Sequence, residues 1–422
     1  MPNPFSRDRF GRPQVFAILL LLAFLAQALY VIARRPLAGG ELGYIQTGEL
    51  RLRGQSQSAP HFVSPLIAVI AAIPVVAAGR TSLVADDARD ADLPIEDDSL
   101  RWPARLPFVL IGLLVGGSLW YVARRLYGNA GGYIALALYV FSPAVALSAH
   151  VGPGIVAMLG VFGIIYISIA LAHTFYPSDV GFLRECRPRW KRVGLLVAAI
   201  LLALGAAPGA LLVLPIALAF MLYLLPAPGP NERSRWWMPF AVLAITTALA
   251  LAALLALNGL RAAALAQQVS LSVAVLSWHF AATRFGLYAE SLLWLTHYPA
   301  LVVFLLLALA AYLASRRARY FGNTAPLLVI VLLWLLAVGG LAPDTLAYGA
   351  IPLRALPFLF LVLAGVAADM LDAKGAVLRR DVAAGMIAAL LLSHAIIGML
   401  ELKRAGGVGH PFEVQGQMTS EK

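Results

Sequence analysis

The strongest constraint on the fold of this chain is a series of uninterrupted apolar runs, most of them about twenty residues long. A helix of that length crosses about 30 Å of hydrocarbon. The chain has 422 residues, of which 61% are hydrophobic and only 13% charged, and its mean hydropathy is +0.83. A soluble core cannot enclose so much apolar surface. Because the runs lack the alternation of strands, the sequence predicts an all-α polytopic membrane protein.

The runs predict about eleven transmembrane helices, at 14–33, 103–123, 131–149, 153–174, 193–207, 208–225, 238–257, 291–313, 325–341, 350–369 and 382–401. Together they form one transmembrane domain over 1–401, with a short tail at 402–422. Pro208 and Gly209 divide one long apolar stretch into a tight hairpin, because proline lacks a backbone donor and glycine permits a turn. The first run resembles a signal peptide, but no small-residue cleavage site follows it, so we expect an uncleaved anchor.

Basic residues are concentrated in alternate loops, which predicts the orientation of the chain. With the N-terminus in the cytoplasm, the inner loops hold the clusters at 124–125, 184–192, 233–235, 316–319 and 374–380. This positive-inside pattern accounts for the net charge of +11 without a nucleic-acid partner. The excess of arginine over lysine is typical of a GC-rich bacterial genome. We expect a multi-pass protein of a bacterial cytoplasmic (inner) membrane.

The residues between the first two predicted spans, 34–102, form the largest polar segment, and we expect it to be an outer loop. Its apolar stretch from Phe62 to Gly79 would invert every later loop if it crossed the membrane, so we expect an interfacial or re-entrant helix. The side chains of Glu49, Arg51 and Arg53 are expected to be a solvated helix face. The single cysteine, Cys186, excludes an internal disulfide.

Five stretches in the first 260 residues carry a family resemblance through their order rather than through any single motif. They are 40–54 (GELGYIQTGELRLRG), 61–66 (HFVSPL), 104–128 (beginning ARLPF), 141–159 (beginning FSPAV) and 235–240 (RWWMPF). This order resembles the GT-C glycosyltransferases, in particular the protein O-mannosyltransferase and lipid A aminoarabinose transferase group. The resemblance implies a GT-C fold whose outer face transfers a sugar from a polyprenyl-phosphate carrier to an acceptor.

The resemblance also implies roles for particular residues. Glu41 stands at the acidic motif and is the expected catalytic base, since a carboxylate at the mouth of the outer loop can take a proton from the acceptor. Arginine side chains are expected to neutralise the departing phosphate. Three positions depart from the family pattern: Gly40 replaces the aspartate of Asp-Glu, Gly154 replaces that of Pro-Asp, and 206–209 replaces Lys-Gly-Pro.

The candidate substrate-binding residues all lie at the expected outer ends of spans or in outer loops, and each has a simpler structural interpretation. Arg354 sits about one turn inside an apolar helix, which is costly unless the side chain pairs or snorkels to the interface, and it is the best candidate to hold a lipid-linked phosphate. Interfacial anchoring, loop hydrogen bonds and snorkelling are the alternatives. The full set is His61, Arg105, His150, Arg284, Tyr348 and Arg354.

Two hypotheses for function stay open at this point. One is a glycosyltransferase whose partners are a polyprenyl-phosphate-linked sugar and membrane lipid. The other is a catalytically inactive protein on the same scaffold, serving as a lipid-binding or accessory subunit of a membrane complex. A transporter is less favoured, because paired half-repeats and mid-membrane charges are absent. The cofactor is unknown: a divalent metal is an open option, but the sequence offers no clear ligand set.

Overall fold

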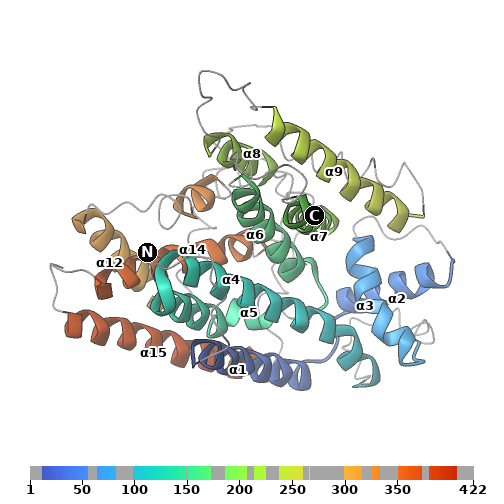
Figure 1. Ribbon diagram of the computed structural model, residues 1–422. Coiled ribbons are helices and arrows are strands. Elements are labelled where there is room, and N and C mark those ends of the chain that lie inside the picture. The colour runs from blue at the N-terminus through green and yellow to red at the C-terminus, as the bar shows by residue number, and fades with distance from the viewer. Residues whose placement is uncertain are drawn as a thin grey trace, which may run out of the picture.

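Figure 1 shows the computed structural model, in which every labelled element is a helix. The structure describes residues 12–55, 64–81, 98–148, 150–172, 186–206, 213–224, 237–259, 266, 299–315, 326–332, 350–372 and 380–405. Within these ranges six helices are long and apolar enough to cross a membrane. The predicted all-α polytopic architecture is therefore confirmed.

Most predicted spans coincide with a helix to within a few residues, because each apolar run is bounded by charged residues, proline or glycine. The helix at Met238–Leu257 has the same bounds as its predicted span. The helices of this group are α1 (Arg12–Arg34), α6 (Pro153–Ala172), α7 (Cys186–Ala206), α8 (Val213–Tyr223), α9 (Met238–Leu257), α12 (Pro299–Ser315), α14 (Ala350–Asp372) and α15 (Arg380–Ala405). Residues 207–212, 291–298 and 333–341 of the predicted spans lie outside the described ranges, and so does the hairpin turn predicted at Pro208 and Gly209.

The second and third predicted spans form one kinked element, α4 (Asp98–Val140), followed by the short helix α5 (Pro143–Leu147). The kink is at Gly128, whose φ of 80° is left-handed and is readily adopted only without a side chain. The third span was expected to run to residue 149, and this boundary is wrong: the helix ends at Val140. Pro143 cannot donate a backbone hydrogen bond to the preceding turn, so the chain turns at Ser142 and restarts.

The polar segment after α1 contributes two helices, α2 (Gly39–Leu52) and α3 (Pro65–Ala77). The 13 residues of α3 extend about 20 Å at 1.5 Å per residue, which is less than the hydrocarbon thickness. This length is consistent with the interfacial or re-entrant helix expected there. The Ser64 hydroxyl caps α3 by accepting from the Ile67 N–H and also donates to the Gly205 carbonyl of α7. The cap thereby ties α3 to a long apolar helix.

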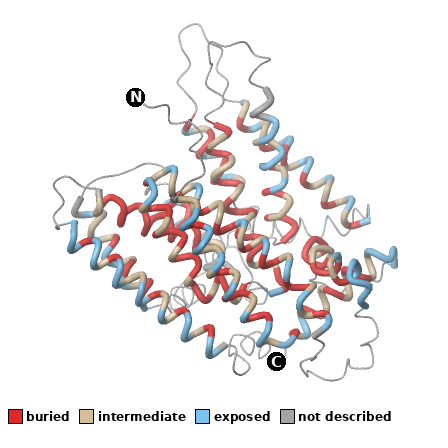
Figure 2. The backbone as a smooth tube through the Cα atoms, turned by 60° about the horizontal axis from the view of Figure 1, so that its bottom comes forward, coloured by how far each residue is buried: buried red, intermediate tan, exposed pale blue. Residues whose placement is uncertain are grey.

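Burial separates a central group of helices from an outer group, as Figure 2 shows. Helix α14 is central: its Phe358 and Phe360 are fully buried, and Phe358 stacks on Tyr166 of α6. Helices α9 and α15 are peripheral and expose large apolar side chains such as Ile245 and Leu392. In water such faces would be unfavourable, but a bilayer solvates them. Helix α3 of the polar segment meets this bundle at α4, α7 and α9.

Candidate functional site

The candidate site forms around the first turn of α2, where the chain leaves α1. Glu41 is the third residue of this helix, and its Oε2 accepts a hydrogen bond of 3.0 Å from the Ala38 N–H, which is otherwise an unpaired donor at the helix start. A carboxylate in the first turn also interacts favourably with the helix dipole. The local sequence therefore places the Glu41 carboxylate at the N-terminal end of α2.

A buried ion pair holds this carboxylate. Arg105 of α4 donates from Nε to Glu41 Oε1 at 2.9 Å and from Nη2 to Glu41 Oε2, so the pair is bidentate. Glu41 is 5% exposed and Arg105 is 3% exposed. The Val151 N–H, between α5 and α6, also donates to Oε1 at 2.9 Å. Each carboxylate oxygen thus accepts two hydrogen bonds.

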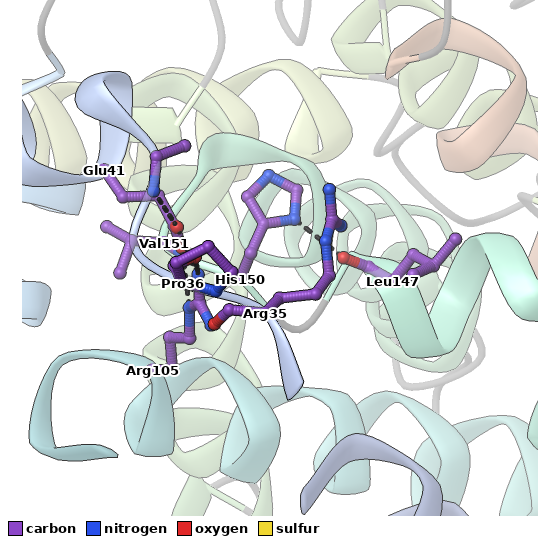
Figure 3. A network of polar contacts seen from close by, with 8 residues as sticks. Arg35, Pro36, Glu41, Arg105, Leu147, His150 and Val151 are labelled. Atoms are coloured by element: carbon purple, nitrogen blue, oxygen red, sulfur yellow. Dashed lines mark hydrogen bonds and ion pairs between the residues drawn. The ribbon is translucent and has the colours of Figure 1, made fainter. Parts of the chain in front are cut away.

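Arg105 extends the network to the end of α1. Its Nη1 donates to the Arg35 carbonyl and its Nη2 to the Pro36 carbonyl, both at 2.7 Å. Figure 3 shows these groups converging from four segments: the residues after α1, the start of α2, α4, and the turn before α6. We call Glu41, Arg105 and their backbone partners the Glu41–Arg105 clamp. The clamp fixes the start of α2 on the helical bundle.

The electrostatics of the clamp favour the ionised form of Glu41. Burial alone would raise the pKa of Glu41, but the hydrogen bonds and positive charge of Arg105 outweigh it. The charge of His150 and the Ala38 N–H act in the same direction, and the net result is a pKa below the ordinary value of 4.5. An anion stabilised in this way is a weak proton acceptor.

His150 lies beside the clamp and is exposed. Its Nδ1 lies 2.7 Å from the Leu147 carbonyl at the end of α5. The next residue but one, Gly152, gives the ring space, because a Cβ there would lie 2.9 Å from the imidazole Nε2. The structure thus brings Glu41, Arg105 and His150 of the sequence-predicted set into one place.

The remaining predicted residues do not join this cluster in the described structure. Arg354 lies in the first turns of α14, and its Nε is buried with no hydrogen-bond partner. No described contact links Arg354 to the clamp. His61, Arg284 and Tyr348 fall outside the described residues.

A second polar cluster lies at the other end of α2, and the sequence analysis misjudged it. Glu49 is completely buried instead of solvated, and it accepts from Arg53 at 2.6 Å and from the Thr81 hydroxyl after α3. Arg51 donates to the Leu257 carbonyl at the end of α9, at 3.0 Å. Helix α3 covers α2, so Glu49, which was expected to be solvated, lies in the interior. The sequence signal for this cluster was the close spacing of Glu49 with Arg51 and Arg53.

The residues present do not fit a divalent metal. In the described ranges no three histidine, cysteine, aspartate or glutamate side chains gather as ligands. The acid at the first motif accepts four hydrogen bonds from nitrogen donors, including a cation, and that arrangement opposes cation binding.

Comparison with known proteins places the fold. Neither a family model nor a curated protein matches the sequence. The apo oligosaccharyltransferase of Archaeoglobus fulgidus is similar, with a TM-score of 0.54 and 13% identity over 93% of this chain and 56% of that chain. The archaeal oligosaccharyltransferase AglB from Archaeoglobus fulgidus, in complex with an inhibitory peptide and a dolichol-phosphate, gives a TM-score of 0.52 at 14% identity over the same shares of both chains.

A further solved structure is less similar to this chain. ArnT from Cupriavidus metallidurans matches over 84% of this chain and 77% of its own, with a TM-score of only 0.33 and 12% identity. The chain spans little more than half the length of the oligosaccharyltransferase it matches. At such identities the likeness concerns the fold alone. The chain has a GT-C transmembrane fold, as its motif order predicted.

Proposed function

We propose that this protein is an integral membrane glycosyltransferase that moves a sugar from a polyprenyl-phosphate carrier to an acceptor on the outer face of the membrane. The observation that carries the proposal is the GT-C fold. The structural match to the apo oligosaccharyltransferase covers 93% of the chain. One of the similar structures is a complex with a dolichol-phosphate, which is a lipid of the proposed class. Because fold does not fix function, the polar groups must supply the chemistry.

Transfer from a glycosyl phosphate requires two things of the protein: a cation for the departing phosphate and a proton acceptor for the attacking group. One candidate for the first role is Arg354, as the sequence analysis proposed. Its buried Nε has no hydrogen-bond partner in the described structure, and a charged side chain in an apolar helix is costly. An anionic headgroup would offset that cost and make charge-assisted hydrogen bonds.

The role of Glu41 is different from the one expected of a base. Each of its oxygens already accepts two hydrogen bonds, and its pKa is lowered. Removing a proton from an acceptor would require the clamp to open. We therefore propose that Glu41 and Arg105 are positioning residues that hold the start of α2 at the site.

A second candidate function is favoured by the residue beside the clamp. Gly40 is exposed, and a Cβ built there meets no atom within 4 Å, so the position has room for a side chain and offers none. The related motif has an aspartate there. A protein that keeps the clamp and lacks this acid fits a lipid-binding or accessory subunit that performs no transfer.

One experiment separates the two candidates. The purified protein is reconstituted in vesicles with a panel of polyprenyl-phosphate sugars, and both donor binding and release of polyprenyl phosphate are measured. Donor binding with turnover is the result expected of the enzyme. Binding without turnover supports the accessory role, and absence of binding to every donor contradicts both.

A gain-of-function variant sharpens the comparison. Gly40→Asp restores the acid in open space, and Gly39→Asp is the matched control, because its Cβ also meets nothing within 4 Å. If the chain is an accessory subunit that lost its base, turnover appears in Gly40→Asp alone. If the wild type is an enzyme, it shows turnover without either substitution.

A further inference from the structure

The polar groups around the clamp fall into two sets. Glu41 and Arg105 are buried and make several hydrogen bonds each, as described above. His150 is exposed and Arg35 is half-buried, and in the described part of the chain neither the His150 Nε2 nor the Arg35 guanidinium has a hydrogen bond or ion pair. The two open groups are therefore the ones available to a ligand.

The hydrogen bond of His150 defines which nitrogen is free. A carbonyl oxygen only accepts, so the contact between Nδ1 and the Leu147 carbonyl at 2.7 Å requires a proton on Nδ1. In the neutral ring the lone pair then lies on Nε2 of this exposed side chain. This is the arrangement of a general base: one nitrogen is oriented by a fixed acceptor, and the other is free to take a proton.

Charged groups from three segments surround the ring. Glu41 on α2 interacts electrostatically with His150 across the clamp. Arg105 on α4 is neutralised by Glu41, and Arg35, after α1, is the other cation at the site. Figure 3 shows the Arg35 guanidinium and the His150 imidazole both pointing away from the Arg105 side chain. The backbone of Arg35 is held in place because its carbonyl accepts from Arg105.

We propose that His150 is the general base of the reaction and that Arg35, which lies at the same site, faces the leaving phosphate in place of Arg354; this rests on the proposed glycosyltransferase function. The acceptor hydroxyl oxygen attacks the anomeric carbon of the donor sugar. Its proton passes to His150 Nε2, a new glycosidic C–O bond forms, and the bond between the anomeric carbon and the phosphate oxygen breaks with its electron pair. Polyprenyl phosphate leaves as an anion beside Arg35, and the imidazolium returns its proton to solvent.

The test compares three variants of the full chain in vesicles with the donor that the wild type uses. His150→Asn keeps a donor for the Leu147 carbonyl and removes Nε2, so kcat falls about a hundredfold or more while donor binding is retained. His150→Ala loses a similar factor and regains turnover with added imidazole, which a purely structural residue would not do. Arg35→Gln raises the KM for the donor about tenfold or more, as expected for a lost charge-assisted hydrogen bond.

A fourth variant tests the geometry without removing the ring. Gly152→Ala places a methyl group 2.9 Å from Nε2, so the imidazole must move and kcat falls. Wild-type turnover that is unchanged in His150→Asn overturns the assignment and leaves the glycosyltransferase function standing. Absence of turnover in the wild type overturns the proposed function and the assignment with it.

Discussion

Breaking the Glu41–Arg105 clamp should cost the protein much of its stability, and Glu41→Gln is the smallest change that does so. Glutamine has the same shape but keeps only one oxygen acceptor. Each oxygen of Glu41 accepts two hydrogen bonds, so the change leaves two donors facing an amide. One of those two donors belongs to Arg105, which also remains buried without its counter-charge.

Two routes to the magnitude agree. Hydrogen bonds to charged groups contribute about 1.5–3 kcal/mol each, so the loss of two costs about 3–6 kcal/mol. Removing one partner of a buried ion pair costs about 3–5 kcal/mol. Because about 1.4 kcal/mol is a factor of ten, the equilibrium constant for unfolding should rise at least a hundredfold.

The assay is denaturation by SDS in mixed micelles, followed by tryptophan fluorescence. Glu401→Gln is the matched control, because it breaks an ion pair with Arg404 that is exposed, which is worth less than about 1 kcal/mol. Arg105→Met and the double variant complete a thermodynamic cycle. The double variant should be more stable than the sum of the single losses predicts, since it leaves no unpaired charge. A Glu41→Gln protein as stable as the control would refute the clamp.

The remaining predictions concern pH, packing and orientation. Because the folded pKa of Glu41 lies below 4.5, its contribution to stability is complete above that pH and is lost as the pH falls further; a stability profile of Glu41→Gln should therefore lack this acid limb. Gly48→Ala should destabilise the protein by more than about 1 kcal/mol, because its Cβ would lie 2.0 Å from the Ala68 carbonyl oxygen of α3. Gly43→Ala is the control, because a Cβ there has open space and should cost nothing. Thermal unfolding of the two variants tests this difference. In intact cells a membrane-impermeant maleimide should label a cysteine placed at Gly43 and should reach Cys186 only after permeabilisation; the reverse pattern would contradict the predicted orientation.

The sequence predicts the fold wherever one local property decides it. An apolar run needs only its own length and flanks to become a membrane helix, and α9 therefore matches its prediction from Met238 to Leu257. The end of α4 was missed because Ala135 to Leu147 is apolar except for Ser142, and hydropathy does not register the turn that Ser142 and Pro143 impose.

The site was harder to predict because it depends on contacts between distant residues. Glu41 and Arg105 are 64 positions apart, and each was identified as a candidate by motif, but their pairing depends on how α2 meets α4. Arg35 was not identified, because it lies outside the five stretches that carry the family resemblance. Within the described residues it is distinguished by its fixed backbone and by a guanidinium that makes no hydrogen bond or ion pair there.

The most direct test of the account is a transfer assay with the purified wild-type protein in vesicles that contain a polyprenyl-phosphate sugar and a soluble acceptor. The account predicts glycosylated acceptor and polyprenyl phosphate in equal amounts, with the acceptor modified only in the compartment facing α2. Failure to consume any donor of this class, in protein shown to be folded, would contradict it.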